Sequence, residues 1–336
     1  MGTKINHSWK KGVRPKRNKS SNPEHISKKE APGIYGLVVA RYGAHIKVED
    51  EHRQQYRCTT RKRVSTIVCG DRVNWLPGPH KTGVILNIEP RNSLLARPDD
   101  RGKIKPLAAN IDQLFIVIAA TTVAGKQSGK SPNSIDFHLL DRYIAAAEAS
   151  SIQPVIVVNK IDLLDKESLT NITLRFSLYQ RIGYRIITTS CKTKEGLDTL
   201  KSLLIGSISV FVGQSGVGKS SLIDLYIPEH HIRTGAVSEL TGLGRHTTTL
   251  TSLYHCPEGG DVIDSPGVRE FGLWNMNAAE VAAAFIEFRH YLSQCKFNNC
   301  RHMREPGCSV KQGVTDRKID AARYRSYQAI IQSLEN

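Results

Sequence analysis

Residues 211–221 read F-V-G-Q-S-G-V-G-K-S-S, a match to the spacing G-x-x-x-x-G-K-[ST]. Glycines at the fixed positions let the backbone curl until successive N–H groups face phosphate oxygens. The lysine can reach the outer phosphates of a nucleotide, and the serine hydroxyl can ligate magnesium. A glycine-rich turn between two core elements is the alternative interpretation. The pattern predicts a triphosphate-binding loop built from Gly213, Gln214, Ser215, Gly216, Val217, Gly218, Lys219, Ser220 and Ser221.

A second motif, N-K-I-D, directly follows the apolar segment 154–158, which reads as a buried strand. Its carboxylate, Asp162, can accept hydrogen bonds from the ring N–H and the exocyclic amine of guanine, a donor pair that adenine lacks. Lys160 can lay its stem along the base, and Asn159 can tie the motif to the phosphate loop. Alone, four residues could simply end a strand and cap a helix. The carboxyl ends of parallel strands meet at one crevice, however. The two motifs together predict a GTP site that includes Asn159, Lys160, Ile161 and Asp162.

Three further segments could complete such a site. T-S-C-K ends the next expected strand, and backbone N–H groups near Ser190 and Cys191 are expected to contact the base. D-S-P-G follows another apolar segment, so that Asp264 can hold magnesium through water and the Gly267 amide can sense the γ-phosphate. Between them lies G-L-G-R-H-T-T-T, 242–249, whose threonines could enter a strand or reach magnesium. The expected magnesium residues are Ser220, Thr248 and Asp264.

Three of the seven cysteines gather near the C-terminus in the pattern C-x4-C-x-H-x5-C. The odd number and the uneven spacing favour a metal site over a disulfide framework. Three thiolates and one imidazole form a closed tetrahedral zinc set that leaves no position for a substrate. Reduced cysteines with a chance histidine are the alternative. The pattern predicts one structural zinc ion held by Cys295, Cys300, His302 and Cys308.

The formal net charge of the chain is +16, which is large for 336 residues. Residues 1–30 contribute nine Lys or Arg against two Glu, and the remaining excess lies in sequence that is expected to fold. A polyanionic partner is expected, with nucleic acid ahead of an anionic membrane. A basic surface that only keeps the protein soluble is the alternative. Apolar runs such as 114–120 are too short to span a bilayer, and no signal peptide is evident, so we expect a cytoplasmic protein.

The first third of the chain divides into an arm and a barrel. Residues 1–32, rich in Lys, Arg, Asn and Ser, read as a disordered basic arm. Short alternating segments in 33–105 predict a small β-barrel of the oligonucleotide-binding (OB) type that binds RNA. Its expected strands are 34–42, 44–48, 54–59, 71–76 and 83–88, and 91–107 reads as a connector. The basic and aromatic residues on or beside these strands are Arg53, Arg57, Arg61, Lys62, Arg63, Tyr42 and Tyr56.

From residue 106 to residue 275, strand and helix patterns alternate. This predicts an α/β domain with a doubly wound, largely parallel sheet. The expected strands are 113–120, 154–158, 184–189, 207–212, 247–256 and 261–263. The expected helices are 134–150 with a serine cap, 169–181 with Gly183 as its stop, 196–204 and 220–226. Residues 276–336 read as a mostly helical domain that carries the cysteine cluster.

The order of the motifs is unusual. GTPases ordinarily run from the phosphate loop through the switch segments to N-K-x-D, and here N-K-I-D comes first. That order indicates a circular permutation, which is feasible where domain termini lie close together at the surface. With G-Q-S-G-V-G-K-S-S, G-R-H-T-T-T, D-S-P-G and the cysteine–histidine cluster following in turn, residues 34–336 closely resemble the RsgA family of ribosome small subunit-dependent GTPases, also called YjeQ or YloQ.

The resemblance implies an N-terminal OB-fold, a circularly permuted P-loop GTPase domain and a C-terminal zinc-binding domain. It also implies GTP hydrolysis to GDP that the small ribosomal subunit stimulates late in its maturation, with rRNA binding and release. We expect a monomer. Two other functions stay open: a nucleotide-regulated RNA-binding module with little turnover, and a P-loop kinase or ATPase, against which N-K-I-D argues.

Many GTPases place a glutamine just after the D-x-x-G element, where it orients the attacking water. Val268 stands at that position and cannot do so, which predicts slow intrinsic hydrolysis that a partner or another residue completes. His246 in G-R-H-T-T-T is the candidate catalytic residue, because neutral imidazole can orient water. The resemblance points the same way. A histidine that contacts the ribosome or is simply exposed is the alternative.

Overall fold

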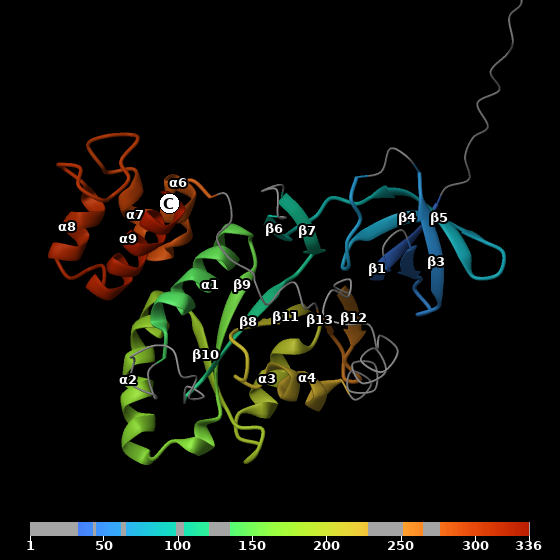
Figure 1. Ribbon diagram of the computed structural model, residues 1–336, viewed down its shortest axis with the longest axis horizontal. Helices are drawn as coiled ribbons and strands as arrows, with labels where there is room; N and C mark the ends of the chain where they lie inside the picture. Colours follow the sequence, from blue (N-terminus) through green and yellow to red (C-terminus); the bar gives the residue numbers. More distant parts are fainter. Residues whose placement is uncertain are drawn as a thin grey trace, which may run out of the picture. The chain divides into compact units, whose positions relative to one another are not determined.

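The computed structural model describes residues 33–42, 45–61, 65–98, 104–120, 135–227, 251–264 and 276–335. By its contacts the chain separates into Met1–Pro32 and a second unit, Gly33–Asn336. The expected basic arm, 1–32, lies outside the described residues. The elements below all belong to the second unit and are labelled in Figure 1.

Five strands form the predicted barrel. They are β1 (Ile34–Tyr42), β2 (His45–Glu49), β3 (Gln55–Thr60), β4 (Arg72–Gly78) and β5 (Thr82–Ile88). β2 pairs antiparallel with β1 and β3, β3 runs parallel to β5, and β4 pairs with both β5 and β1, which closes the ring. Trp75 is fully buried inside, with the Tyr56 ring 4.7 Å from its own. The alternating apolar residues of these strands therefore face one small core, as the sequence pattern requires.

The prediction that 91–107 is a connector without regular structure is wrong. It contains β6 (Leu94–Pro98) and most of β7 (Ile104–Ala109), which pair antiparallel as a separate two-stranded sheet. Leu95 and Ala108 are fully buried, and they join the main core. The apolar run Leu94–Leu95 is too short to read as a strand by periodicity, and pairing with residues farther along the chain stabilises it.

The nucleotide-domain sheet follows the predicted alternation. Its strands are β8 (Gln113–Ala119), β9 (Gln153–Asn159), β10 (Arg185–Thr189), β11 (Ile208–Val212), β12 (Thr251–His255) and β13 (Asp261–Asp264). They lie in the order β10-β9-β8-β11-β13-β12, and all neighbours are parallel except β12 with β13. The direction in which successive strands are added to the parallel sheet reverses between β8 and β11, and such a reversal defines the doubly wound arrangement.

Helices cover both faces of this sheet (Figure 1). They are α1 (Phe137–Ala149), the short η1 (Ile161–Leu163), α2 (Lys166–Ile182), α3 (Leu197–Leu204) and α4 (Lys219–Tyr226). Leu114 and Ile116 of β8 share a core with α1 and α2, whereas Phe115 and Val117 share another with α3 and α4. Gly183 ends α2 in a left-handed conformation, as predicted. The serine cap of 134–150 is wrong, because Asp136 accepts the capping hydrogen bond from the Leu139 N–H.

The C-terminal part is helical and packs against α1. It contains α6 (Ala278–Ala284), η3 (Ile286–Phe288), α7 (Arg289–Leu292), α8 (Ser309–Thr315) and α9 (Ala321–Glu335). Phe285, Phe288 and Tyr327 are fully buried and lie in the same core cluster as residues of α1. In the part of the chain that the structure describes, no helix has the length and apolar character needed to cross a membrane.

The barrel and the nucleotide-domain sheet are joined through one strand pair. β1 pairs antiparallel with β12, with Ala40 opposite Ser252 and Arg41 opposite Thr251. The eleven strands β10 to β4 thus form one hydrogen-bonded sheet that runs from one domain into the other. The sequence pattern did not predict this junction.

Candidate nucleotide and metal sites

The loop between β11 and α4 has the backbone shape that its glycines permit. Gly213 has a φ of 138°, and a Cβ there would lie 2.1 Å from the Val117 carbonyl oxygen. Gly218 has a φ of 101°, and a Cβ there would lie 2.3 Å from the Asn159 side-chain nitrogen. Any larger residue at either position would be strained and would clash. The loop is therefore pressed against β8 on one side and against the end of β9 on the other.

Lys219 begins α4, and its ammonium group lies inside the curve of the loop. Its Nζ donates to the Gly213 carbonyl at 2.8 Å and to the Gln214 carbonyl at 2.7 Å. The same curve exposes Gln214, Ser215 and Gly216 to solvent, whereas Val217 is buried. A lysine ammonium beside a glycine-rich loop at the start of a helix is the arrangement that receives phosphate groups.

The N-K-I-D segment lies directly beside this loop. The Asn159 side-chain amide donates to the Val217 carbonyl at 2.9 Å, and the Lys160 ammonium donates to the Gly216 carbonyl at 2.6 Å. Asn159 is 1% exposed, and Lys160 adopts a left-handed φ of 64° that turns the chain out of the strand. The expected tie between the two motifs is therefore present in the structure.

Asp162 is held from the neighbouring strand. The Ser190 hydroxyl donates to Asp162 Oδ1 at 2.6 Å, and the backbone N–H groups of Lys192 and Thr193 donate to the Ser190 hydroxyl at 3.2 and 3.1 Å. Ser190 thus contacts Asp162 through its side-chain hydroxyl. The second carboxylate oxygen of Asp162 makes none of these bonds, so it is available to a ligand in the cavity.

These segments enclose a cavity of about 270 Å³. Its lining residues are Asn159, Lys160, Asp162, Leu163, Cys191, Lys192, Gly218 and Ser221. Burial raises the pKa of the Cys191 thiol, with the Asp162 charge adding to the effect, so that the thiol is neutral beside the cavity. Ile161 lies in the motif, but its side chain packs into the core.

Three residues of this site were missed from the sequence. Leu163 and Lys192 line the cavity, and the Thr189 hydroxyl donates to Asn159 Oδ1 at 3.1 Å. The T-S-C-K motif contains Thr189 and Lys192 and could have indicated both. Leu163 follows Asp162 directly and carries no chemical signal of its own.

The expected magnesium residues are only partly described. Ser220 is exposed in the first turn of α4, and Asp264 ends β13. β13 runs parallel to β11, with Ile263 opposite Val210, so that Asp264 and the phosphate loop follow neighbouring strands at the same edge of the sheet. Thr248, Gly267, His246 and Val268 lie outside the described residues.

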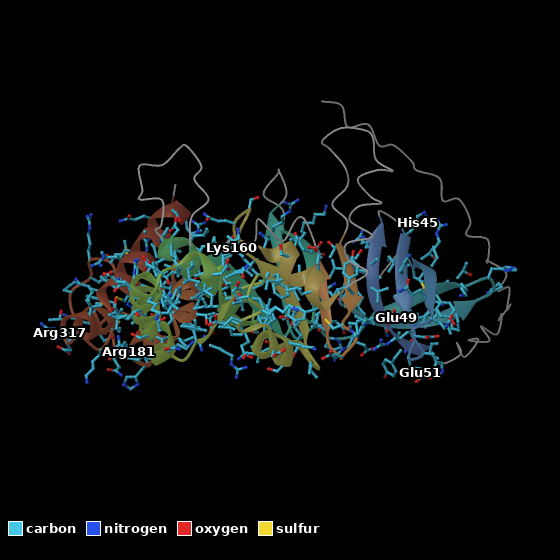
Figure 2. All side chains as sticks on the ribbon, turned by 90° about the horizontal axis from the view of Figure 1, so that it is seen from below. His45, Glu49, Glu51, Lys160, Arg181 and Arg317 are labelled. Atoms are coloured by element: carbon cyan, nitrogen blue, oxygen red, sulfur yellow. The ribbon has the colours of Figure 1, made fainter. Side chains whose placement is uncertain are left out.

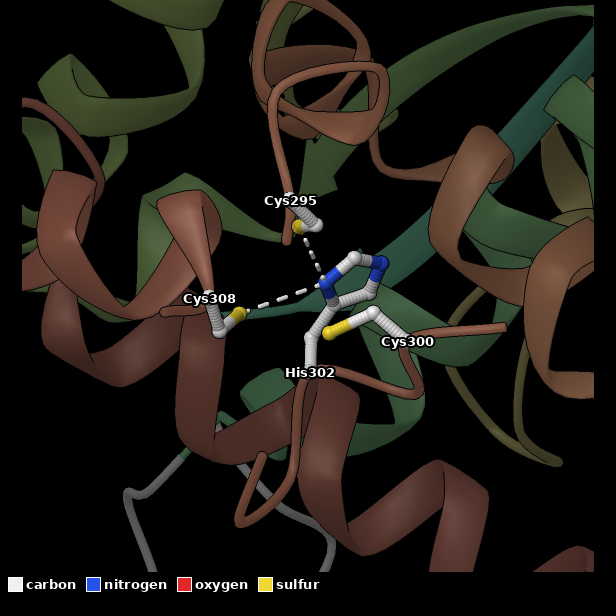
Figure 3. Close-up of side chains that lie close together, drawn as sticks. All are labelled: Cys295, Cys300, His302 and Cys308. Carbon is white, nitrogen blue, oxygen red and sulfur yellow. Dashed lines mark hydrogen bonds between the residues drawn. The ribbon is translucent and has the colours of Figure 1, made fainter. Parts of the chain in front are cut away.

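The four expected metal ligands come together in the C-terminal part. Their ligand atoms all lie within 4.8 Å of one another, the single such cluster of metal-ligating residues among the residues described (Figure 3). His302 Nδ1 lies 3.5 Å from the Cys295 sulfur and 3.4 Å from the Cys308 sulfur. Burial lowers the pKa of His302, which keeps its imidazole neutral and able to bind a metal. Three sulfurs and one nitrogen at this spacing fit a tetrahedral zinc ion.

The backbone around these ligands is held by side chains that the spacing did not reveal. Glu305 accepts hydrogen bonds from the N–H groups of Arg301, Met303 and Arg304 at 3.0, 2.8 and 3.0 Å. From α9, the Tyr324 hydroxyl donates to the His302 carbonyl and the Tyr327 hydroxyl donates to the Arg301 carbonyl, both at 2.7 Å. The ligand loop is therefore attached to the last helix.

The described part of the barrel surface carries three of the expected basic residues, but the expected aromatic residue Tyr56 packs inward. Arg53, Arg57 and Arg61 are exposed. Arg57 Nε donates to His45 Nδ1 at 3.2 Å. His45, the first residue of β2, is labelled in Figure 2. Lys62, Arg63 and the Tyr42 side chain lie outside the described part. The Tyr56 ring packs on Trp75. Tyr35 on β1 is 73% exposed, and the sequence pattern did not single it out.

Comparison with known proteins identifies the family. Residues 88–274 match the family model described as RsgA GTPase. The chain belongs to the RsgA GTPase family. This confirms the predicted GTP-hydrolysing enzyme, and the OB-type barrel, the permuted GTPase domain and the helical part with its cysteine–histidine set agree with it.

Curated RsgA relatives cover most of the chain. A protein of Klebsiella pneumoniae is 42% identical over 308 residues, which span 89% of this chain and 84% of the relative. A protein of Photorhabdus laumondii is 44% identical over 308 residues, spanning 89% and 85%. Both are named small ribosomal subunit biogenesis GTPase RsgA.

Two solved structures of RsgA relatives share the fold. YjeQ from Thermotoga maritima has a TM-score of 0.72 and 31% identity, covering 90% of this chain and 99% of that one. YloQ, described as a circularly permuted GTPase, has a TM-score of 0.68 and 28% identity, covering 94% and 98%. The circular permutation predicted from the motif order agrees with that description.

Proposed function

We propose that this RsgA-family chain hydrolyses GTP in the late maturation of the small ribosomal subunit. In this proposal it binds rRNA, the subunit stimulates hydrolysis, and hydrolysis leads to release. The observation that carries the nucleotide part is the hydrogen bond from Asn159 to Val217, since it joins the two segments that the sequence predicts to bind guanine and phosphate. The names of the curated relatives support the ribosomal part.

Guanine recognition is assigned to the cavity beside Asp162. With Ser190 holding one carboxylate oxygen, the other is free to accept hydrogen bonds from the guanine ring N–H and its amine. The backbone N–H groups of Ser190, Lys192 and Thr193 are bonded within their own loop. The N–H of Cys191 is therefore the one that we assign to the base, and the stem of Lys160 covers it. Buried polar groups that lose their partners penalise the wrong ligand, which is how such a site rejects adenine.

Phosphate binding is assigned to Gly213–Ser221. The Lys219 ammonium exchanges its bonds with the Gly213 and Gln214 carbonyls for bonds with the outer phosphates. Magnesium, when bound, neutralises charge on the phosphates. Ser220, Asp264 and Thr248 would hold it. Gly267 would donate its N–H to the γ-phosphate, and His246 would orient the attacking water.

We assign one structural zinc ion to Cys295, Cys300, His302 and Cys308. All four donors belong to the protein, so the ion stabilises the fold and takes no part in the reaction. The attachment of the ligand loop to Tyr324 and Tyr327 supports this role.

The partner is assigned as the small ribosomal subunit through its rRNA. The net charge of +16 and the exposed arginines of the barrel support a polyanionic surface as partner. We divide the chain into the arm 1–32, the barrel 33–105, the GTPase domain 106–275 and the zinc domain 276–336, with the boundary at 105 lying inside β7. The protein acts as a cytoplasmic monomer.

The test is single-turnover hydrolysis of GTP and of ATP with and without purified small subunits, with large subunits as the control. We expect slow GTP hydrolysis alone, strong acceleration by small subunits only, and no turnover of ATP. GTP binding without acceleration would favour a nucleotide-regulated RNA-binding module instead. Equal turnover of ATP would overturn the guanine assignment.

A further inference from the structure

Strand β12 is held on both sides, by the barrel and by β13. On one side Ser252 pairs with Ala40 of β1, and on the other Ser252 pairs with Asp264. The far end of the β12–β13 hairpin is closed by His255 opposite Asp261. β12 therefore separates Asp264 from the barrel. Asp261, which pairs with His255, is the first residue of β13, and Asp264 is the last.

His255 bridges two carboxylates that come from different domains. Its Nδ1 lies 2.6 Å from Asp261 Oδ1 and its Nε2 lies 2.7 Å from Glu49 Oε1. Glu49 ends β2 of the barrel and is 5% exposed (Figure 2). The Gln55 side-chain amide donates to the other oxygen of Glu49 at 3.3 Å, which fixes the carboxylate in place.

The charges at this bridge favour a protonated histidine. The Asp261 carboxylate, and after it the Glu49 carboxylate, raise the pKa of His255 to about 9 against the opposing effect of burial. Burial raises the pKa of Glu49, but His255 outweighs it and the pKa is lowered, with a small contribution from Arg53. At neutral pH one cation thus lies between two anions, and a cluster of opposite charges away from bulk water is stronger than a surface pair.

The barrel also touches β13 next to Asp264. Gly70 has a φ of 87°, and a Cβ there would lie 2.1 Å from the Ala109 carbonyl oxygen and 3.2 Å from Ile263 Cδ1. The turn is completed by the Ala109 N–H, which donates to the Cys69 carbonyl at 2.9 Å. The barrel thus meets the hairpin at the residue before Asp264 as well as at its far end.

We propose that Glu49, His255 and Asp261 form a tether by which the barrel holds the β12–β13 hairpin in register and so positions Asp264 beside the phosphate loop. His255 is then a positioning residue for GTP hydrolysis, and the barrel that meets RNA is linked to the magnesium residue. The proposal rests on the magnesium role assigned to Asp264. Because Asp162 lies in η1 after β9 and Lys219 begins α4 after β11, neither belongs to the β12–β13 hairpin. Loss of the tether therefore affects the rate and leaves nucleotide affinity nearly intact.

Glu49→Gln and His255→Gln test the tether, since each removes the charge pair with little change in shape. The matched controls are Glu51→Gln and His52→Gln, because those side chains are 86% and 79% exposed and lie 3.6 Å from each other. We expect each tether variant to lower the single-turnover hydrolysis rate about tenfold, as a small displacement of a catalytic group does. The dissociation constant for GTP should stay within about twofold, and both controls should match the wild type.

Amide hydrogen exchange provides a readout that does not depend on the nucleotide. Exchange of the amides in 251–255 and 262–264 should become faster in both tether variants and in neither control. Unchanged exchange would overturn the proposal, and so would faster exchange with an unchanged rate. Failure of the proposed function has a different signature: the wild type would not hydrolyse GTP, or Asp264→Asn would leave the rate unchanged.

Discussion

The side-chain amide of Asn159 donates to the carbonyl oxygen of Val217 across 2.9 Å, joining loops that lie 58 positions apart in the sequence. The Thr189 hydroxyl donates to the amide oxygen of Asn159, so the amide nitrogen must face Val217. Asn159 and Thr189 are at most 1% exposed. Because buried polar groups are costly when unpaired, this chain of bonds fixes the distance between the N-K-I-D segment and the glycine-rich loop.

Asn159→Ala should therefore weaken binding of both GTP and GDP. The loss leaves the Val217 carbonyl and the Thr189 hydroxyl unpaired, which corresponds to an affinity about 10- to 100-fold lower. Titration calorimetry with GDP would measure it. The control is Asn171→Ala on the exposed face of α2, which should bind as the wild type does. An Asn159→Ala protein with wild-type affinity would mean that the two loops are positioned independently.

Asp162→Asn should change which base the cavity accepts. Its carboxylate would be replaced by a group that both donates and accepts, so GTP affinity should fall about 100-fold or more, while xanthosine triphosphate, with an oxygen in place of the amine, should bind better. Competition binding with GTP, ATP and xanthosine triphosphate measures this. Asp165→Asn is the matched control, since asparagine caps α2 as well as aspartate does. Equal loss for all three nucleotides would contradict base contact by Asp162.

The sequence predicted the strands of the barrel and of the nucleotide sheet because local spacing determines them. The same holds for the contact of Asn159 with the phosphate loop, since the two motifs follow β9 and β11, the parallel strands on either side of β8, and so meet at the same edge of the sheet. The pairing of β1 with β12 and the contact of Glu49 with His255 could not be predicted, because they join ordinary residues far apart in the chain. The tyrosine hydroxyls that hold the metal loop bond to backbone carbonyls, which leave no pattern in the sequence.

His255 should make stability depend on pH. Its pKa is raised in the folded protein to about 9. Its contribution to the free energy of unfolding is therefore full below its pKa in the unfolded chain, about 6.5, and is lost as pH rises through its pKa in the folded protein. The contribution should be at most about 3 kcal/mol. Urea unfolding of the wild type and of His255→Gln should differ most near pH 6 and converge near pH 10. A difference that does not change with pH would mean that His255 is neutral in the folded protein.

Arg323 should be the most costly single charge to remove from the described part of the chain. It is 1% exposed, and its guanidinium donates to Asp141 of α1 at 2.5 Å and to Glu287 at 2.7 Å. Arg323→Met leaves the buried Asp141 and the 10% exposed Glu287 carboxylate without their partner, which should lower the free energy of unfolding by about 3–5 kcal/mol. Denaturant unfolding measures it, with Arg325→Met on the exposed face of α9 as the control. Because Asp141 and Arg323 contact each other, their substitutions are not independent. The double variant Asp141→Asn and Arg323→Met should lose less unfolding free energy than the sum of the losses in the two single variants.

Removal of the metal should loosen the C-terminal part without abolishing guanine binding. The protein purified without chelator should carry about one zinc ion per chain, and Cys300→Ser should carry none, because three ligands do not close a tetrahedral site. Cys191→Ser, a cysteine of the nucleotide cavity, should keep its zinc. Tyr327→Phe should keep zinc as well but release it faster to a chelator, since the hydrogen bond to the Arg301 carbonyl is lost. Atomic absorption and chelator kinetics measure these outcomes. Full zinc content in Cys300→Ser would mean that Cys295, His302 and Cys308 hold the ion with a ligand from elsewhere.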